Sequence, residues 1–311
     1  MNWTGRNVLV TGANGFLGAH LVKRLVDARA TVVCLIKHVT PLQPVPAGAS
    51  AVPGDVENFD LLCSILKERQ VDAVFHLAAR PIVLEAQVDP LPTLETNVRG
   101  TYNLLEAARR WGKIRALVVA TSDKVYGDSP HLPYRERQPL DGRGLYDTSK
   151  VCQDVLAQSY ARNFKMPIGI ARCGNLYGPG DVQWSRIIPG TIKSLLAGER
   201  PVIRGDGKSM RDYFYVEDAA NAFMTLASSE LRGQAYNFGT GHPTSTLEVV
   251  EALVARSGVD LPPVVLGGAQ GEIHAQYLDC GKAADELGWH PRVGLDEGLD
   301  RTWAWYKKVL S

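Results

Sequence analysis

The stretch NVLVTGANGFLGAH, residues 7–20, constrains the fold of this chain more than any other part of the 311-residue sequence. Its apolar, β-branched start predicts a buried parallel strand, which leads into Gly12, Gly15 and Gly18 and then into a helical pattern over 19–26. In such a strand–turn–helix unit the glycines allow a sharp turn, close approach of a pyrophosphate, and tight packing of helix on sheet. Unpaired N–H groups at the helix N-terminus favour phosphate. We therefore expect this turn to bind a dinucleotide cofactor.

Composition limits the class of protein and its surroundings. The 34 basic and 33 acidic residues are well mixed and leave a net charge of +1, so nothing favours nucleic acid as a partner. The five cysteines are odd in number and form no CxxC pair, which favours reduced thiols in the cytoplasm over disulfides or a metal site. The first strand begins too early for a signal peptide, and no apolar run approaches the ~18 residues that cross a bilayer. We expect a soluble cytoplasmic protein that does not bind membranes.

Apolar strands alternate with helical patterns along the first half of the chain. Strands are expected at 31–36, 72–77, 116–120 and 168–172, and helices at 61–69, 93–111 and 149–163. This alternation predicts an α/β fold with a Rossmann-type, doubly wound parallel sheet. His76, inside an apolar strand, is expected to be a core histidine rather than a ligand.

The composition loosens after residue 174, where GNLYGPGDVQW contains three glycines. We expect the chain to leave the cofactor domain there and to build a smaller α/β lobe for the substrate. The predicted division is a dinucleotide-binding domain over 1–174, to which 213–239 returns, and a substrate lobe over 175–311 with helices at 246–256 and 295–309.

Three short segments bear on the rest of the cofactor. Lys37 stands where many dinucleotide folds have an acidic residue for the ribose hydroxyls. It either meets a 2′-phosphate, which would favour NADP, or is a solvated loop charge. Asp55 either meets the adenine amino group or forms an Asx-turn. Ala78 and Ala79 suit a point where a cofactor crosses the sheet, although helix packing would also explain them.

A second constellation carries the predicted chemistry. Ser122 follows the strand 116–120, and Tyr146 and Lys150 are spaced i and i+4 at a helix start, so both can lie on one face. A lysine beside a phenol favours the ionised form and lowers a reference pKa of about 10. The sequence therefore predicts Tyr146 as general base for a hydroxyl that Ser122 orients.

The segments TGANGFLG, FHLAA, TSDKVYG, YDTSK and RDYFYVEDAA resemble the extended short-chain dehydrogenase/reductases that act on nucleotide-sugars. The resemblance runs from end to end and includes the C-terminal LGWHP. It implies a tightly held NAD (NADP is possible) that is reduced and reoxidised in each turnover, a nucleotide-diphosphate sugar substrate, and a homodimer. By motif position Ser122 matches the family serine/threonine, Tyr146 the base and Lys150 the ribose-binding lysine. The cofactor contacts it implies are Gly12, Asn14, Gly15, Phe16, Leu17, Gly18, Lys37, Asp55, Val56, Leu77, Ala78, Ala79, Asn97, Tyr146 and Lys150.

Asp123 and Lys124 distinguish the reactions of this family. In its 4,6-dehydratases an acidic residue after the serine/threonine protonates the leaving C6 hydroxyl, and the next residue removes the C5 proton. Simple 4-epimerases usually carry small uncharged residues there. The resemblance therefore favours a nucleotide-sugar 4,6-dehydratase, and HLAARPIV, YDTSKVCQD and RCGNLYGPGDVQWSRIIP are most similar to the branch that acts on CDP-glucose. An Asp–Lys pair that only holds a loop is the structural alternative.

Arg211 matches the family arginine that clamps the nucleotide diphosphate, a bidentate role suited to a guanidinium group. The full set of expected substrate contacts is Arg80, Ser122, Asn175, Arg186 and Arg211. RDYFYVEDAA has the commoner epimerase/dehydratase form rather than the one frequent in CDP-glucose dehydratases. A 4-epimerase, in which Asp123 has no acid role, therefore stays open. A uronic acid decarboxylase and a non-catalytic dinucleotide sensor are less well supported.

Overall fold

The computed structural model describes residues 1–268 and 273–310. Its centre is a seven-stranded sheet in the order β10-β6-β5-β4-β1-β2-β3, in which every pairing is parallel. The strands are β1 (Asn7–Thr11), β2 (Thr31–Ile36), β3 (Ser50–Pro53), β4 (Ala73–His76), β5 (Ala116–Ser122), β6 (Ile168–Cys173) and β10 (Ala235–Phe238). The strand order reverses between β1 and β4, which makes that point the switch where ligands of such sheets bind. The predicted Rossmann-type sheet is confirmed.

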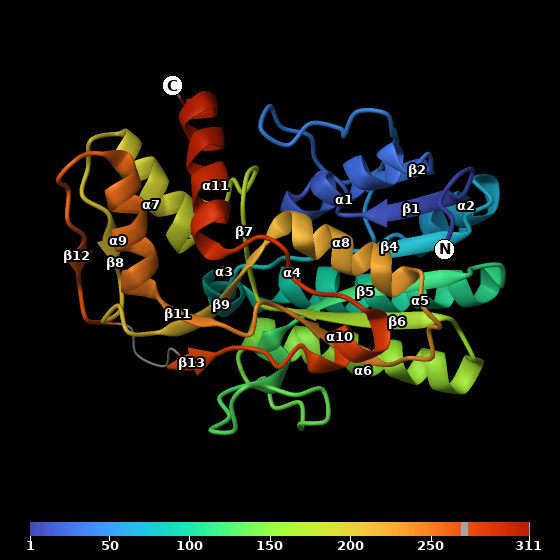
Figure 1. Cartoon of the computed structure of the whole chain (residues 1–311). Helices are drawn as coiled ribbons and strands as arrows, with labels where there is room; N and C mark the ends of the chain where they lie inside the picture. The colour runs from blue at the N-terminus through green and yellow to red at the C-terminus, as the bar shows by residue number, and fades with distance from the viewer. Residues whose placement is uncertain (269–272, 311) are drawn as a thin grey trace.

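Helices cover both faces of this sheet (Figure 1) because its strands are apolar on both sides. In β1, Val8 and Val10 face one core and Leu9 faces the other. The first core lies under α1 (Phe16–Asp27), α8 (Val216–Ala227) and α10 (Gly281–Leu287), and the second lies under α2 (Phe59–Glu68), α5 (Gly100–Trp111) and α6 (Leu145–Phe164). Most predicted elements lie within a few residues of these bounds.

Two boundaries differ from the predicted ones in ways that affect the site. The predicted helix over 93–111 is the last part of a longer helical run formed by α3 (Val83–Val88), α4 (Pro90–Leu94), a π-helical turn η1 (Glu95–Arg99) and α5. Helix α6 begins at Leu145, four residues before the predicted start, with Gly144 as its N-cap residue. Tyr146 therefore lies in the first turn of α6, so the i, i+4 relation to Lys150 holds within a helix.

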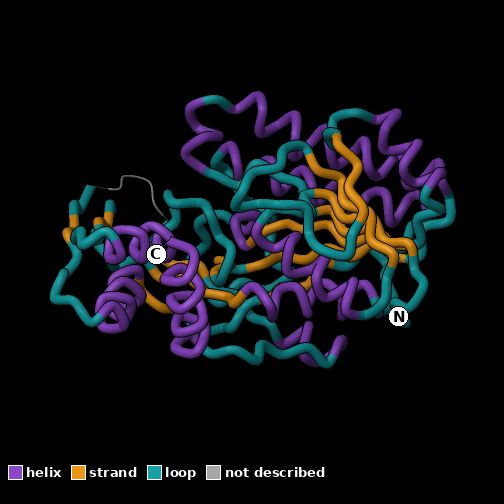
Figure 2. The backbone as a smooth tube through the Cα atoms, turned by 90° about the horizontal axis from the view of Figure 1, so that it is seen from above, coloured by secondary structure: helices purple, strands orange, loops and turns teal. Residues whose placement is uncertain are grey.

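A smaller lobe with its own apolar core lies beside the large sheet (Figures 1 and 2). Its strands are β7 (Asn175–Tyr177), β9 (Met210–Tyr215), β11 (Pro243–Ser245) and β13 (Ala275–Gln276) in one sheet, and β8 (Val202–Ile203) with β12 (Val264–Val265) in another. Its helices are α7 (Ile187–Leu196), α9 (Thr246–Ser257) and α11 (Leu295–Leu310). Of the segment 213–239, β9 pairs within the lobe, whereas α8 and β10 pack in the cofactor half. Residues 269–272 and 311, part of the predicted lobe, lie outside the described residues.

His76 is the core histidine that the sequence predicts. Its two ring nitrogens each lie 2.9 Å from a threonine hydroxyl, that of Thr11 and that of Thr101. Burial, together with the charge of Lys150, lowers the pKa of His76 to about 3, so the ring is neutral.

None of the described helices combines the length and apolar character that a bilayer crossing requires. The described residues also contain no cluster of histidines, cysteines or carboxylates arranged to hold a metal ion.

Candidate active site

A cleft of about 740 Å³ opens at the carboxyl ends of the parallel strands. It extends from the glycine turn after β1, across Ala78 at the switch point, to Tyr213 in the lobe. Its walls come from both halves of the molecule, as expected where a dinucleotide and a second ligand must meet.

The glycine turn at one end of the cleft leaves no room for a side chain at Gly12 or Gly18. Gly12 has a φ of +67°, and a Cβ there would lie 2.8 Å from the backbone N of Ala78. A Cβ on Gly18 would collide with the carbonyl oxygen of Gly12. Gly15 is the N-cap residue of α1, whose first turn is capped by no side chain. Bare backbone N–H groups at a helix N-terminus are the donor set that a pyrophosphate requires, so the turn fits a dinucleotide.

The structure brings nearly all the expected cofactor residues to the cleft wall. Those that line it are Gly12, Asn14, Gly15, Phe16, Leu17, Gly18, Lys37, Asp55, Val56, Leu77, Ala78, Ala79, Tyr146 and Lys150. Asn97 does not. It is fully buried, and its amide bonds the backbone N of Arg80 at 2.8 Å and the hydroxyl of Ser149 at 2.9 Å. Asn97 therefore lies outside the cleft wall and holds the backbone of Arg80, which lines the cleft.

Lys37, which follows β2, and Asp55, which follows β3, meet in the wall of the cleft. The Lys37 amine forms an ion pair with the Asp55 carboxylate and lies 4.0 Å from Glu57 Oε1. Asp55 Oδ1 also accepts a hydrogen bond of 3.1 Å from the backbone N of Glu57, so it forms the expected Asx-turn while it lines the cleft. The charge of Lys37, which the sequence assigns either to a 2′-phosphate or to a solvated loop, is therefore partly neutralised by two carboxylates.

Ser122, Tyr146 and Lys150 line the cleft on the β4–β5 side of the switch point. The Lys150 amine donates to the carbonyl oxygen of Ala120 at 3.1 Å and lies 5.9 Å from the centre of the Tyr146 ring. Burial lowers the pKa of Lys150 to about 8. The three residues that the sequence singled out line one wall.

The expected lowering of the Tyr146 pKa by Lys150 is wrong for this structure. Burial raises the pKa of this phenol above its usual value. The positive charge of Arg186 and a hydrogen bond with Ser122 act in the opposite direction, but burial outweighs both. The sequence could not show how completely the ring is enclosed, nor that the Lys150 amine is bonded to a strand carbonyl.

Asp123 and Lys124 lie in the short 3₁₀ helix η2 (Asp123–Tyr126) that follows β5. Asp123 is 1% exposed; its Oδ1 accepts a hydrogen bond of 2.8 Å from the Ser122 hydroxyl. Its Oδ2 is buried without a hydrogen-bond partner among the described residues. The Lys124 amine donates to the side-chain oxygen of Gln276 in β13, and Lys124 lines the cleft whereas Asp123 lies behind Ser122.

The lobe supplies the far wall. Asn175 and Arg186 line the cleft from the lobe, and Arg186 forms an ion pair of 3.0 Å with Asp181. Arg80, which follows β4, lines the cleft from the cofactor half. Arg211 does not line it: its guanidinium is buried in the lobe sheet and donates to the carbonyl oxygens of Met210 and His274, at 2.8 and 3.4 Å.

Several wall residues were missed from the sequence. The polar and aromatic ones among them include His38, Gln43, Thr121, Cys173, Tyr177, Asp181, Ser185 and Tyr213. Tyr213 stands two residues after Arg211 in the same quoted motif, so strand alternation puts both residues on one face of β9 and could not have shown which of them lines the cleft.

The chain is similar in sequence and in structure to proteins of known function. Residues 8–239 match the family described as the NAD dependent epimerase/dehydratase family. The chain is 34% identical to a dTDP-glucose 4,6-dehydratase of Streptomyces antibioticus, over 97% of this chain and 92% of that protein. It is 32% identical to a CDP-glucose 4,6-dehydratase of Salmonella typhimurium, over 98% and 91%. Among solved structures, the UDP-glucose 4-epimerase of Thermotoga maritima with UDP-glucose superposes with a TM-score of 0.93 at 27% identity, covering 98% and 100%. Both dehydratases and epimerases are thus similar to this chain.

Proposed function

Because the chain belongs to the NAD-dependent epimerase/dehydratase family, we propose that it is a nucleotide-sugar 4,6-dehydratase. The observation that carries the proposal is Asp123, an almost fully buried carboxyl at the end of β5. One of its oxygens is bonded to Ser122, and the other has no partner among the described residues. A buried carboxyl beside a hydroxyl-binding serine suits proton donation to a leaving hydroxyl.

The side chains divide the work as follows. Ser122 orients the C4 hydroxyl of the sugar, and Tyr146 Oη accepts the proton of that hydroxyl in its ionised form. Because burial raises the pKa of Tyr146, this step requires the phenol to have lost its own proton first. Lys150 binds the cofactor ribose, and the turn at Gly12, Gly15 and Gly18 binds the pyrophosphate. Bound NAD would supply the acceptor for a hydride from C4 and later the donor of that hydride to C6. Asp123 protonates the C6 hydroxyl as it leaves, which requires this hydroxyl to reach past Ser122, because Asp123 itself does not line the cleft. Lys124 removes the C5 proton.

The substrate is a nucleotide-diphosphate hexose, with CDP-glucose among the candidates. Asn175 and Arg186 line the cleft from the lobe, which supports their assignment as contacts of the diphosphate or the sugar.

An epimerase is the second candidate, and one observation favours it. The Lys124 amine is bonded to Gln276, so the proposed C5 base already has a partner in β13. An enzyme that only inverts C4 needs neither Lys124 as a base nor Asp123 as an acid, so this contact would not hinder its reaction.

Incubation with CDP-, dTDP- and UDP-glucose separates the two. A dehydratase forms a 4-keto-6-deoxy product whose mass is lower by one water. Inversion at C4 without loss of mass would reject the dehydratase in favour of the epimerase, and no conversion of any of the three would reject both for these glucose nucleotides.

A further inference from the structure

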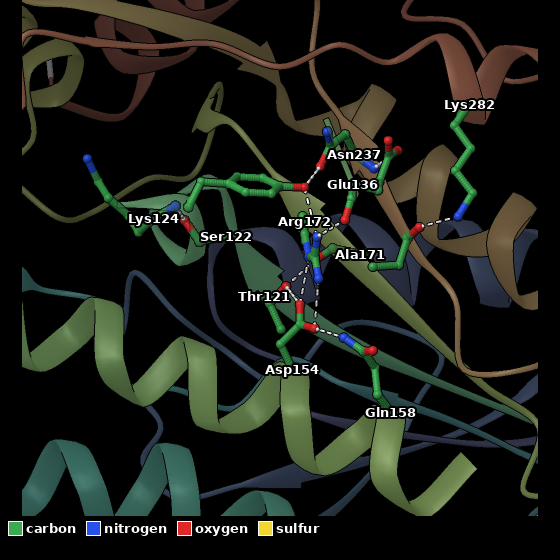
Figure 3. Close-up of polar contacts among 12 residues, drawn as sticks. Thr121, Ser122, Lys124, Glu136, Asp154, Gln158, Ala171, Arg172, Asn237 and Lys282 are labelled. Atoms are coloured by element: carbon green, nitrogen blue, oxygen red, sulfur yellow. Dashed lines mark hydrogen bonds and ion pairs between the residues drawn. The ribbon is translucent and has the colours of Figure 1, made fainter. Parts of the chain in front are cut away.

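A buried ion pair lies directly behind the reacting residues. Arg172 in β6 and Asp154 in α6 make two contacts, 2.8 Å between Nε and Oδ2 and 2.9 Å between Nη2 and Oδ1. Figure 3 shows the Arg172 side chain at the centre of a group of polar contacts. Their side chains are 3% and 0% exposed, and within the described part of the chain this is the one ion pair with both side chains so deeply buried.

The carboxylate end of this pair attaches α6 to β5. Asp154 lies one helical turn after Lys150, and its Oδ2 accepts a hydrogen bond of 3.3 Å from the Thr121 hydroxyl. Lys150 itself bonds Ala120, the preceding residue of β5, at 3.1 Å. Two successive turns of α6 therefore hold two successive residues of the strand that ends in Ser122.

The guanidinium end attaches η2. Arg172 Nη1 donates to the hydroxyl of Tyr126 at 2.9 Å, and this hydroxyl donates to Oδ1 of Asn237 in β10 at 2.6 Å. Tyr126 is the last residue of η2, and Asp123 is the first. At the other end, the Ser122 hydroxyl caps η2 by accepting from the backbone N of Lys124 at 3.3 Å. The helix that carries Asp123 is thus fixed at both ends.

A buried ion pair adds little net stability over an apolar pair of the same size, because both charges lose their hydration. A two-point contact between guanidinium and carboxylate does, however, fix the angle and separation of the elements that carry it. We propose that Arg172 and Asp154 are positioning residues that hold Tyr146 and Lys150 on α6 at a set separation from Ser122 and Asp123. The inference rests on the proposed function, since these four side chains act on one sugar.

The mildest test removes one hydroxyl. Tyr126→Phe keeps the ring and cuts the link between Arg172 and η2. Its control is Tyr236→Phe, which removes the hydroxyl of another buried tyrosine, one in β10 that donates to Glu286 at 2.7 Å and lies outside the Arg172 network. We expect similar losses of melting temperature. Tyr126→Phe alone should slow single-turnover reduction of the bound nicotinamide, by roughly 10-fold, because displacements under 1 Å affect rate strongly. KM and cofactor content should stay unchanged.

A second variant removes the ion pair as a unit. Arg172→Met combined with Asp154→Leu eliminates both charges and keeps bulk, so the protein should fold and bind NAD. Its single-turnover rate should fall at least as far as that of Tyr126→Phe. A folded double variant with the wild-type rate would overturn the positioning role. If the double variant does not fold, the comparison of Tyr126→Phe with its control decides, and equal rates in those two overturn it.

Amide hydrogen exchange separates failure of this inference from failure of the proposed function. Without any substrate, residues 122–127 should exchange faster in Tyr126→Phe than in Tyr236→Phe. A wild-type protein that acts on no nucleotide-hexose refutes the proposed function, and the exchange result then decides the positioning role alone. Equal exchange in the two variants would in that case overturn it.

Discussion

Gly15 is the residue at which the cofactor turn can be tested with least damage to the fold. Its backbone is extended at φ −71° and ψ 175°, which a β-branched residue adopts easily, and a Cβ would lie 3.1 Å from the carbonyl oxygen of Gly12. We expect Gly15→Val to fold with a melting temperature near that of cofactor-free wild type, but to lose bound NAD. Purified Gly15→Val that retains stoichiometric NAD would contradict the assignment of this turn.

Lys37 decides between the two nicotinamide cofactors. Its pairing with Asp55, and the nearness of Glu57, place carboxylates where a 2′-phosphate would need to bind. We therefore expect tighter binding of NAD than of NADP, and similar small changes in both affinities for Lys37→Ala. Titration calorimetry on cofactor-free protein measures this. A selective loss of NADP affinity in Lys37→Ala would show instead that Lys37 binds the 2′-phosphate.

At the scale of the element, helix α6 carries a pH-dependent contribution to stability through Lys150. Burial lowers the pKa of this amine from 10.5 to about 8. Below pH 8 the cost of burying the charged amine is fully present, and between these two values the unfolded chain binds a proton that the folded protein has released. The stability of wild type relative to Lys150→Met should therefore rise from about pH 8 to pH 10.5.

Urea midpoints of the two proteins across this range test the prediction. The comparison with Lys150→Met is needed because Cys34 and Cys280, whose thiol pKa values are raised by burial, make stability fall at alkaline pH in both proteins. A stability difference that does not change with pH would mean that Lys150 is not buried as the structure places it.

Elements that depend on local sequence were predictable, and contacts between distant elements were not. The glycine turn, the strand before Ser122 and the Tyr146–Lys150 spacing are local, and their place in the cleft follows from strand order. The bond from Lys124 to Gln276 joins residues 152 positions apart. Arg211 carries the family motif, yet its place in β9 directs it to backbone carbonyls rather than to the cleft. Such outcomes depend on tertiary packing, which a short motif does not encode.

At the scale of the whole molecule, the family, the parallel sheet and the NAD-dependent enzyme class that the sequence predicts are confirmed. The division into a cofactor domain over 1–174 with 213–239 and a substrate lobe over 175–311 stays a prediction, as does the cytoplasmic location. The packing of α10 on β10 adds a C-terminal element to the cofactor half.

The homodimer also remains a prediction, and one surface suits it. Neighbouring helices α3 to α6 carry exposed apolar side chains, among them Val88 at 88%, Leu91 at 62% and Val155 at 52% exposure. Burial of such a surface against a second copy would remove apolar area from water. We expect a dimer in sedimentation experiments and a monomer for Val155→Glu combined with Val88→Glu. Wild-type protein that sediments as a monomer at micromolar concentration would contradict this.

The central claim, that Asp123 is the acid of a dehydration, is tested most directly by Asp123→Asn. The amide keeps the size and much of the hydrogen bonding of the carboxyl but cannot deliver a proton. With the nucleotide-hexose that wild type converts, the variant should still reduce its bound NAD, while 4-keto-6-deoxy product falls by ~10²-fold or more. Product formation at the wild-type rate in Asp123→Asn would contradict the account.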